Sequence, residues 1–141
     1  MEFLSKSAAS TQSFAKDFAK NLERGTVIAF RGDLGAGKTC FTYGLCEGLS
    51  FSGEVSSPTF AIVNVYEGGR LPVYHFDMYR VCGWEDLETT GYFDYLDRGD
   101  GIIVVEWSEN IESALPDDTL FITIEKTDED FRKITVGGRS Q

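Results

Sequence analysis

The order of apolar and polar residues along the chain predicts an alternation of strands and helices. Residues 27–30 and 101–106 are nearly continuous apolar runs, the pattern of strands buried on both faces, and the second run ends in a carboxylate. Apolar residues at i, i+4 spacing predict helices over residues 10–23 and 37–49. Shorter runs predict strands at 3–4, 60–66, 71–76, 119–125 and 131–136, and helical turns at 84–89, 91–96 and 109–115.

These elements predict an α/β fold in which helices flank a mixed β-sheet. The buried strands are expected to form a mostly parallel centre, with a hairpin around residues 67–70 in an antiparallel extension. Ser10 or Thr11 is the expected N-cap of the first long helix, and Gly25 the residue that closes it. With 141 residues and no linker or repeat, the chain is expected to be a single domain over residues 1–141.

Composition and charge narrow the classes of function. Charged residues make up 26% of the chain, and no apolar run approaches the roughly 20 residues of a membrane span. Residues 1–6 lack the basic-then-apolar order of a signal peptide, so a cytoplasmic protein is expected. Three cysteines without C-x-x-C spacing argue against a disulfide framework or a zinc site. The net charge of −10 argues against independent nucleic-acid binding, so any role near nucleic acid is expected to involve a partner protein.

A glycine-rich segment lies between the first buried strand and the helix that follows it. Residues 32–39 read Gly-Asp-Leu-Gly-Ala-Gly-Lys-Thr and match G-x-x-x-x-G-K-[ST], the phosphate-binding loop of nucleoside triphosphatases. Glycine lets backbone N–H groups approach a triphosphate closely, and a helix N-terminus favours its negative charge. Lys38 is expected to reach the terminal phosphates, and Thr39 to ligate Mg²⁺. The residues expected to bind the nucleotide are Asp33, Leu34, Gly35, Ala36, Gly37, Lys38 and Thr39.

Two carboxylates at strand ends are candidates for catalysis. Glu106 ends a buried strand, where ligands sit in open α/β sheets. Beside a phosphate loop, it is expected to hold Mg²⁺ directly or through water rather than to be an ordinary solvated side chain. Asp77 ends the returning strand of the hairpin and is expected to orient the attacking water or to bind Mg²⁺ through water. Thr59 follows Pro58 and is either a switch residue that responds to the γ-phosphate or a turn residue.

Three further residues near these carboxylates each have two interpretations. His75 lies two residues before Asp77, on the same face of the strand, and a packed, hydrogen-bonded role is favoured over that of a base. Arg80, the third candidate catalytic residue, is either an internal arginine finger or the ion-pair partner of the acidic segment 84–88. Trp107 is expected to point to the opposite face from Glu106, into the core or against the nucleotide-facing helix.

The choice of base is read from a late strand. Guanine-binding proteins of this class place an Asn or Thr before Lys-x-Asp, whereas here Glu125 precedes Lys126, Thr127 and Asp128. A carboxylate cannot donate a hydrogen bond to the guanine carbonyl oxygen. The sequence therefore favours adenine, and ATP with Mg²⁺ are the expected cofactors.

Five motifs in order give the chain a resemblance to a known family. They are Ser7-x-x-x-Thr11, the phosphate loop at 32–39, Ser-Pro-Thr-Phe at 57–60, Leu-Pro-x-Tyr-His-x-Asp-x-Tyr-Arg at 71–80 and Val-Glu-Trp at 105–107. With these motifs the chain resembles the TsaE (YjeE) family, the ATPase component of bacterial tRNA threonylcarbamoyladenosine synthesis, over nearly its whole length. The resemblance implies a small mixed-sheet ATPase that acts with two partners, TsaB and TsaD, which transfer threonylcarbamoyl to adenosine 37 of tRNAs reading A-starting codons.

The same resemblance implies roles for individual residues. Lys38 and Thr39 would bind nucleotide and Mg²⁺, Asp77 would be important for hydrolysis, and Glu106 would belong to the magnesium site. Ser7 and Thr11 would help to shape the nucleotide pocket. The segment 81–83, Val-Cys-Gly, departs from the family pattern. The contacts that the following acidic helix makes with partner proteins are therefore left open.

Three functions follow from these features. The first is an ATPase whose hydrolysis resets a tRNA-modifying complex; it is expected to be slow alone and faster with its partners, because Arg80 alone among the motif arginines is placed to offset transition-state charge. The second is a nucleotide-gated binding module, in which ATP occupancy and not hydrolysis controls partner assembly. The third, a small-molecule kinase, is weakest because the sequence has no obvious arginine-rich lid.

Overall fold

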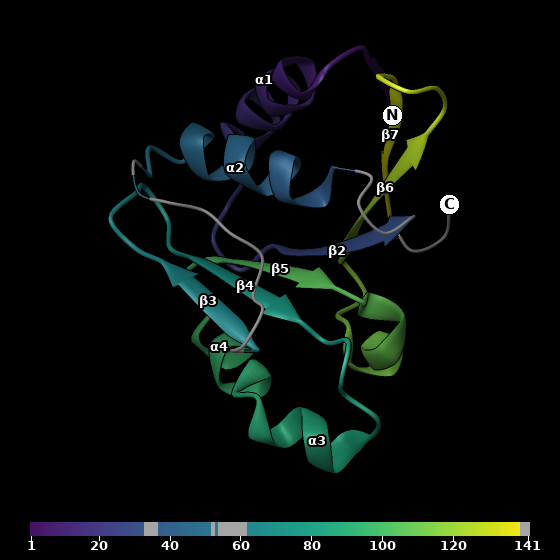
Figure 1. Ribbon diagram of the computed structural model, residues 1–141. Helices are drawn as coiled ribbons and strands as arrows, with labels where there is room; N and C mark the ends of the chain where they lie inside the picture. The colour runs from purple at the N-terminus through teal and green to yellow at the C-terminus, as the bar shows by residue number, and fades with distance from the viewer. Residues whose placement is uncertain (33–36, 52, 54–61, 139–141) are drawn as a thin grey trace.

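The computed structural model describes residues 1–32, 37–51, 53 and 62–138, and its centre is a seven-stranded β-sheet (Figure 1). The strand order is β1-β7-β6-β2-β5-β4-β3. The strands are β1 (Glu2–Ser5), β2 (Val27–Gly32), β3 (Val63–Tyr66), β4 (Val73–Asp77), β5 (Ile102–Glu106), β6 (Leu120–Lys126) and β7 (Arg132–Gly137).

The middle of the sheet is parallel and its two sides are antiparallel. Strand β2 pairs in parallel with both β5 and β6, and β5 pairs in parallel with β4. Strand β3 is antiparallel to β4, and the pairs β6–β7 and β1–β7 are antiparallel as well. The expected α/β fold, a mixed sheet with a parallel centre, is confirmed. Because the four central strands run the same way, their carboxyl ends share one edge of the sheet, which is the edge where ligands bind in open α/β folds.

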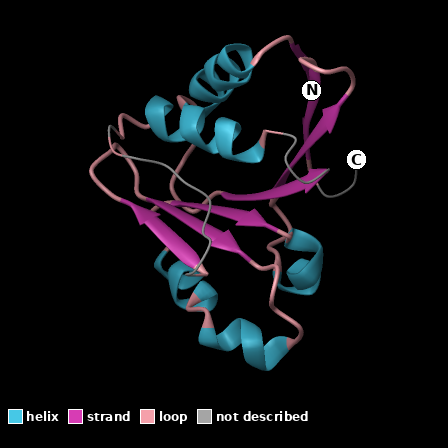
Figure 2. Ribbon diagram, viewed as in Figure 1, coloured by secondary structure: helices cyan, strands magenta, loops and turns pink. Residues whose placement is uncertain are grey.

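Helices cover both faces of the sheet (Figure 2). Helices α1 (Ala8–Ala19) and α2 (Lys38–Gly48) lie on one face, and α3 (Trp84–Thr89), α4 (Tyr92–Arg98) and the 3-10 helix η1 (Ser108–Ala114) lie on the other. No helix in the described ranges is long and apolar enough to cross a membrane.

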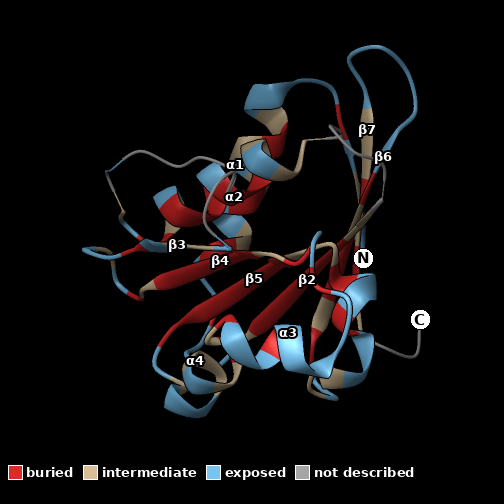
Figure 3. Cartoon of the chain, turned by 60° about the horizontal axis from the view of Figure 1, so that its bottom comes forward, coloured by how far each residue is buried: buried red, intermediate tan, exposed pale blue. Residues whose placement is uncertain are grey.

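The nearly continuous apolar run of β2 is explained by burial on both faces. Ile28 and Phe30 belong to the hydrophobic cluster under α1 and α2. Val27 and Ala29 belong to the cluster under α3, α4 and η1. Because side chains alternate along a strand, a central strand needs apolar residues at every position when helices cover both sides. Figure 3 shows the buried strands as a continuous red layer in the middle of the molecule.

Glycines let α1 and α2 pack closely. A Cβ atom at Gly44 would overlap the backbone of Gln12, and one at Gly48 would overlap the backbone of Lys16. Both glycines lie on α2, four residues apart, so they share the face that meets α1. The position of the helix that follows the phosphate loop is therefore fixed by direct contact with the α1 backbone.

The predicted ends of the first helix are wrong. Helix α1 begins at Ala8 and its N-cap is Ser7, whose side chain accepts a hydrogen bond from the Ser10 N–H at 3.1 Å. Ser10 and Thr11 therefore lie inside the helix, not at its cap. The helix also ends at Ala19, before the expected residue 23. Arg70 donates from its Nη2 atom to the carbonyl oxygens of Ala19 at 3.1 Å and Leu22 at 3.2 Å, so a side chain from the β3–β4 turn closes this end.

Candidate nucleotide-binding site

The phosphate-loop sequence lies where β2 ends and α2 begins. Strand β2 ends at Gly32, and residues 33–36, the first part of the expected phosphate cradle, lie outside the described residues. Helix α2 begins at Lys38, and its N-cap Gly37 has φ 109°, a left-handed conformation that side chains disfavour. The Gly37 carbonyl oxygen accepts from the Phe41 N–H at 2.9 Å. Lys38 and Thr39 are thus in the first turn of a helix whose N–H groups and dipole favour an anion. Thr59 also lies outside the described residues.

Asp77 and Glu106 end neighbouring strands at the same sheet edge as the phosphate loop. They are partners in the parallel β4–β5 register, and β5 is in turn the neighbour of β2. Val73 and Val104 face the α1/α2 cluster. Alternation along each strand therefore places Asp77 and Glu106 on the same face as α2. The structure brings both candidate carboxylates to the edge and face from which α2 starts.

The Asp77 carboxylate is held by the backbone that follows it. Its Oδ1 atom accepts from the Tyr79 N–H at 2.9 Å, and the neighbouring Met78 N–H donates to the Glu106 carbonyl oxygen at 3.0 Å. Asn110, in η1, donates from Nδ2 to the carbonyl oxygens of Met78 at 2.8 Å and Tyr79 at 3.2 Å. The turn after β4 is therefore fastened to both β5 and η1. Asn110 could not be identified from the sequence, because a single polar residue in a short helix has no distinguishing pattern.

The Glu106 carboxylate contacts the His75 ring on the face of the sheet that α2 covers. The His75 side chain is fully buried, with 0% exposure, and its Nε2 atom lies 2.5 Å from Glu106 Oε2. The other ring nitrogen, Nδ1, lies 3.4 Å from the Tyr66 hydroxyl on β3. The Glu106 side chain is only 13% exposed, so this histidine is a main polar contact of a largely buried carboxylate. The packed, hydrogen-bonded position that the sequence favours for His75 is confirmed.

Arg80 and Trp107 also lie just past these strand ends. Arg80 is exposed, and it forms no ion pair with the acidic helix α3 or with any other described residue. The Asp86 carboxylate instead accepts from the Cys82 N–H at 3.1 Å. Trp107 has φ 59°, which ends the strand alternation, and packs against the cluster under α3 and α4, with its ring centroid 4.8 Å from that of Tyr79. Of its two expected positions, Trp107 takes the one toward the core on the face opposite α2, where it is half-buried.

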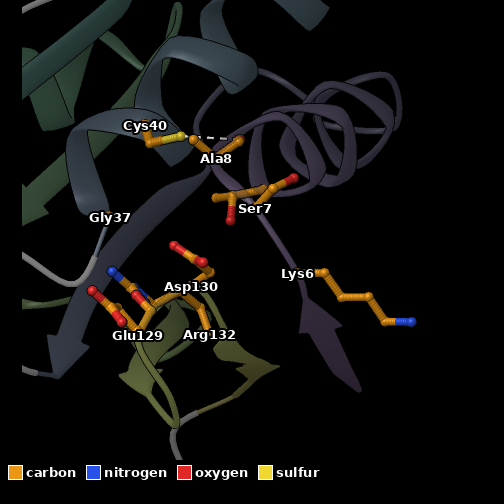
Figure 4. Close-up of a pocket in the computed structure, with 9 residues that line it drawn as sticks. Lys6, Ser7, Ala8, Gly37, Cys40, Glu129, Asp130 and Arg132 are labelled. Carbon is orange, nitrogen blue, oxygen red and sulfur yellow. Dashed lines mark hydrogen bonds between the residues drawn. The ribbon is translucent and has the colours of Figure 1, made fainter.

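A cavity of about 370 Å³ opens beside the start of α2 (Figure 4). Thr11 lines it and is itself nearly buried, with its hydroxyl 2.6 Å from that of Ser5. Ser7 also lines the cavity. The other lining residues are Lys6, Ala8, Gly37, Cys40, Glu129, Asp130 and Arg132. In Figure 4 the Lys6 side chain points away from the others, while Glu129 and Asp130 lie across the opening from Ser7.

The acidic side of this cavity comes from the turn between β6 and β7. Arg132 fastens this turn by donating from Nη1 to the carbonyl oxygens of Asp128, Glu129 and Phe131 at 3.3, 3.2 and 3.0 Å. On the opposite side, the Cys40 thiol contacts the Ala8 carbonyl oxygen at 3.2 Å, and burial raises the pKa of this thiol. In the sequence, residues 126–128 of this turn bear on the choice of base, but no pattern placed Glu129 and Asp130 at a cavity. The place of the turn at the cavity follows from β6 lying beside β2, which brings residues 126–131 to the edge of the phosphate loop.

Comparison with known proteins identifies the family. The family model described as "Threonylcarbamoyl adenosine biosynthesis protein TsaE" matches residues 5–134. A relative from Bacillus subtilis, named tRNA threonylcarbamoyladenosine biosynthesis protein TsaE, is 43% identical over 132 residues, covering 92% of this chain and 82% of the relative. A relative of the same name from Treponema pallidum is 40% identical over 136 residues, covering 96% of this chain and 99% of the relative. The chain belongs to the TsaE family.

The fold agrees with a solved structure of a similar chain. The crystal structure of Bacillus subtilis YdiB superposes with a TM-score of 0.82 at 36% sequence identity, covering 98% of this chain and 84% of that one. The agreement includes the mixed sheet with its parallel centre. It therefore supports the strand order that places Asp77, Glu106 and the start of α2 at one edge in this TsaE-family chain.

The donors at this edge fit a magnesium site completed by phosphates. Among the residues the structure describes, no group of three or more His, Cys, Asp and Glu side chains forms a self-contained metal site. Mg²⁺ is commonly bound by one or two protein oxygen ligands together with phosphate oxygens and water. Thr39 and Glu106 supply a hydroxyl and a carboxylate, which are the oxygen donors such a site needs.

Proposed function

We propose that this TsaE-family chain is a Mg²⁺-dependent ATPase, one P-loop domain over residues 1–141, that supports threonylcarbamoylation of adenosine 37 in tRNA. The observation that carries the proposal is the shared position of Asp77 and Glu106, paired at the ends of β4 and β5 on the α2 face. They lie at the edge where a complete phosphate-loop sequence leads into a helix. A phosphate loop with strand-end carboxylates is the arrangement that P-loop NTPases use for phosphoryl transfer.

Different residues of the chain would bind the phosphates, the nucleoside and the magnesium ion of Mg-ATP. Residues 33–37 would supply backbone N–H groups to the phosphates, and Lys38 a mobile positive charge for the terminal ones. The cavity lined by Thr11, Cys40 and Asp130 would receive the nucleoside end of the molecule, since it opens beside Gly37. Thr39 and Glu106 would hold Mg²⁺, whose charge neutralises the phosphate oxygens.

Asp77 would act on the attacking water. Its carboxylate has one oxygen fixed by the Tyr79 N–H, and Asn110 fastens the backbone of the same turn. A carboxylate held in this way can accept a proton or orient a water molecule without first paying the entropy of ordering itself. Arg80 is exposed beside this turn, and we assign it to charge compensation at the γ-phosphate. An exposed arginine is not preorganised, so hydrolysis by the free protein would be slow.

Partner proteins would complete the site and bring the tRNA. With 13 basic and 23 acidic residues, the chain has little basis for binding a phosphate backbone directly. We therefore assign tRNA contact to TsaB-like and TsaD-like partners, with this chain as the ATP-consuming subunit. Docking of the partners would hold the exposed Arg80 side chain in place and so accelerate hydrolysis only inside the complex.

Replacement of Lys38 tests the nucleotide site directly. Lys38→Ala removes the loop's cation and is expected to weaken Mg-ATP binding at least tenfold without unfolding the protein, because Lys38 is not a core residue. Lys20→Ala is the matched control, since Lys20 is an exposed lysine that forms an ion pair with the exposed Asp17. Titration calorimetry measures both affinities. A folded Lys38→Ala protein with wild-type ATP affinity would refute the proposed site.

A variant of Asp77 separates a function in hydrolysis from one in nucleotide gating. Asp77→Ala is expected to bind ATP and to fail in multiple-turnover tRNA modification reconstituted with the two partners. If this variant instead supports many turnovers while releasing no phosphate, ATP occupancy alone controls the partners, and the chain is a nucleotide-gated binding module.

A further inference from the structure

His75 connects polar groups from three neighbouring strands on the α2 face of the sheet. The residue lies on β4, between Tyr66 of β3 and Glu106 of β5. Its Nε2 atom is 2.5 Å from Glu106 Oε2, and its Nδ1 atom is 3.4 Å from the Tyr66 hydroxyl oxygen. The histidine is fully buried, as is its contact with Tyr66, whereas the Glu106 side chain keeps 13% exposure at the sheet edge.

The chemistry of the three groups gives these contacts a direction. A carboxylate that binds a metal is ionised and only accepts hydrogen bonds, so in a metal-binding state of Glu106 the donor of this contact is the Nε2 atom of His75. A phenol hydroxyl can then donate to Nδ1, which is the acceptor nitrogen of a ring protonated at Nε2. The order of donation runs from Tyr66 through His75 to Glu106. The sole histidine of the chain is thereby set with its N–H aimed at the carboxylate oxygen.

This contact restricts the Glu106 carboxylate more than the backbone can. A glutamate side chain rotates about three bonds, so its strand position alone does not fix its oxygens. A hydrogen bond to one oxygen from a buried, immobile ring fixes the plane of the carboxylate and hence the direction of the second oxygen. Partners that orient a metal ligand in this way commonly contribute 10–100-fold to metal affinity.

We propose that His75 is the positioning residue that holds the Glu106 carboxylate ready to bind Mg²⁺. The inference rests on the proposed function, since it assigns Glu106 to the magnesium site. At a position that only fills the core, an apolar side chain would be more favourable than histidine, because burying a polar ring costs free energy unless the ring is hydrogen-bonded. The polar ring is kept here with its donor directed at the carboxylate.

A matched pair of substitutions tests this role. His75→Gln keeps an N–H donor at about the distance of Nε2, whereas His75→Met has a similar length and no donor. Binding of a fluorescent ATP analogue is titrated with Mg²⁺ and repeated in EDTA, with circular dichroism to verify folding. His75→Met is expected to need about tenfold or more Mg²⁺ for half-maximal effect, His75→Gln to stay within about threefold of wild type, and both to keep wild-type affinity in EDTA.

The ring itself provides a second readout that needs no nucleotide. As the only histidine, His75 gives a single set of imidazole ¹⁵N signals, and these are expected to report a proton on Nε2 in the free wild-type protein. Glu106→Gln is expected to shift the Nε2 signal, whereas Glu112→Gln, at an exposed position of η1, should leave it unchanged. This measurement decides the contact even if His75→Met does not fold.

The outcomes distinguish this inference from the proposed function. Wild-type Mg²⁺ dependence in a folded His75→Met protein would overturn the positioning role alone. An imidazole ¹⁵N signal that does not change in Glu106→Gln would show that His75 does not hydrogen-bond to Glu106. If the wild-type protein binds ATP with no dependence on Mg²⁺, the proposed function fails first, and the metal role of His75 fails with it.

Discussion

Asp77 and Glu106 are direct partners in the parallel β4–β5 register, and each is the last residue of its strand. Beyond this pair, the Met78 N–H donates to the Glu106 carbonyl oxygen, so the chain leaves both strands as one connected turn. Two carboxylates in this arrangement have different surroundings. Glu106 is bonded to a buried histidine, and Asp77 to the backbone of an exposed turn. These surroundings suit the roles proposed above, with Glu106 as a fixed metal ligand and Asp77 as the group that orients water.

Asp77→Ala is expected to keep ATP binding and to lose hydrolysis. Loss of a positioned general base commonly costs about 10²–10⁴ in rate, while Asp77 lies outside the phosphate cradle and should not affect affinity. Phosphate release is measured at saturating ATP, with and without the two partner proteins, alongside the exposed-site control Asp117→Ala. Wild type should be stimulated by the partners. Hydrolysis by Asp77→Ala at the wild-type rate in the full complex would disprove the catalytic role, and absence of stimulation in wild type would disprove the coupling.

ATP is expected to be bound in preference to GTP. Glu125 stands where guanine-binding proteins of this class have a residue that donates to the guanine carbonyl oxygen, and it lies at the end of β6, at the sheet edge of the phosphate loop. The cavity beside Gly37 is also lined by Glu129 and Asp130, whose carboxylates can accept a hydrogen bond from the adenine amino group. Displacement of a fluorescent ATP analogue by each nucleotide measures the preference. Equal displacement by GTP would show that these carboxylates do not read the base.

Gly44→Val is expected to destabilise the protein by about 1–3 kcal/mol or more, because its side chain would overlap the Gln12 backbone of α1. Tyr43→Val is the matched control: it places the same β-branched residue on an exposed position of the same helix and so accounts for helix propensity. Urea unfolding measures both free energies. If the two variants lose the same stability, close packing of α1 on α2 is not what Gly44 provides.

The sequence predicted the parts of the fold that depend on local pattern. The apolar runs at 27–30 and 101–106 became adjacent central strands, because burial on both faces leaves a pattern that needs no knowledge of the neighbours. The helix start was misplaced, since Ser7, Ser10 and Thr11 are all acceptable N-caps and the choice depends on the path of β1 into the helix.

Contacts between distant segments could not be predicted in the same way. The phosphate-loop motif located the site, and the strand-end positions of Asp77 and Glu106 followed from the pattern of their strands. The acidic turn at residues 129–130 reaches the site only because β6 lies beside β2. The order of strands in a sheet cannot be predicted from the local periodicity of the sequence. Asn110 acts through its side-chain amide on a turn more than 30 residues away in sequence. Such contacts depend on the assembled fold.

The three thiols are expected to differ in reactivity. Cys46 is fully buried and burial raises its pKa to about 12, so it stays protonated at pH 8–9 and resists alkylation. Cys82 is exposed and should react first with iodoacetamide, and all three should react in denaturant. Because the unfolded thiol ionises near pH 8.5, the Cys46 contribution to stability is complete below that pH and declines as pH rises toward 12. Peptide mass spectrometry over time gives each rate. Alkylation of Cys46 as fast as Cys82 in the folded protein would contradict the burial.

Arg70→Met is expected to destabilise the C-terminal end of α1 by about 0.5–2 kcal/mol. The Arg70 guanidinium donates to the carbonyl oxygen of Ala19, the last residue of α1, and to that of Leu22 just beyond it. The Leu22 N–H also donates to the Ala19 carbonyl oxygen, so the two contacts fasten one turn at the helix end. A positive charge at this end also interacts favourably with the helix dipole. Amide hydrogen exchange of residues 15–22 should therefore accelerate together with the fall in unfolding free energy.

Two controls separate the hydrogen bonds from the charge. Arg24→Met removes an exposed arginine near the same helix end, and it should leave exchange in α1 unchanged. Arg70→Lys keeps the charge but lacks the planar fork that reaches two carbonyl oxygens, so it should restore only the salt-sensitive part of the stability. Full restoration by lysine would mean that the dipole interaction is sufficient. No loss in Arg70→Met would mean that the Arg70 side chain does not stabilise the end of α1.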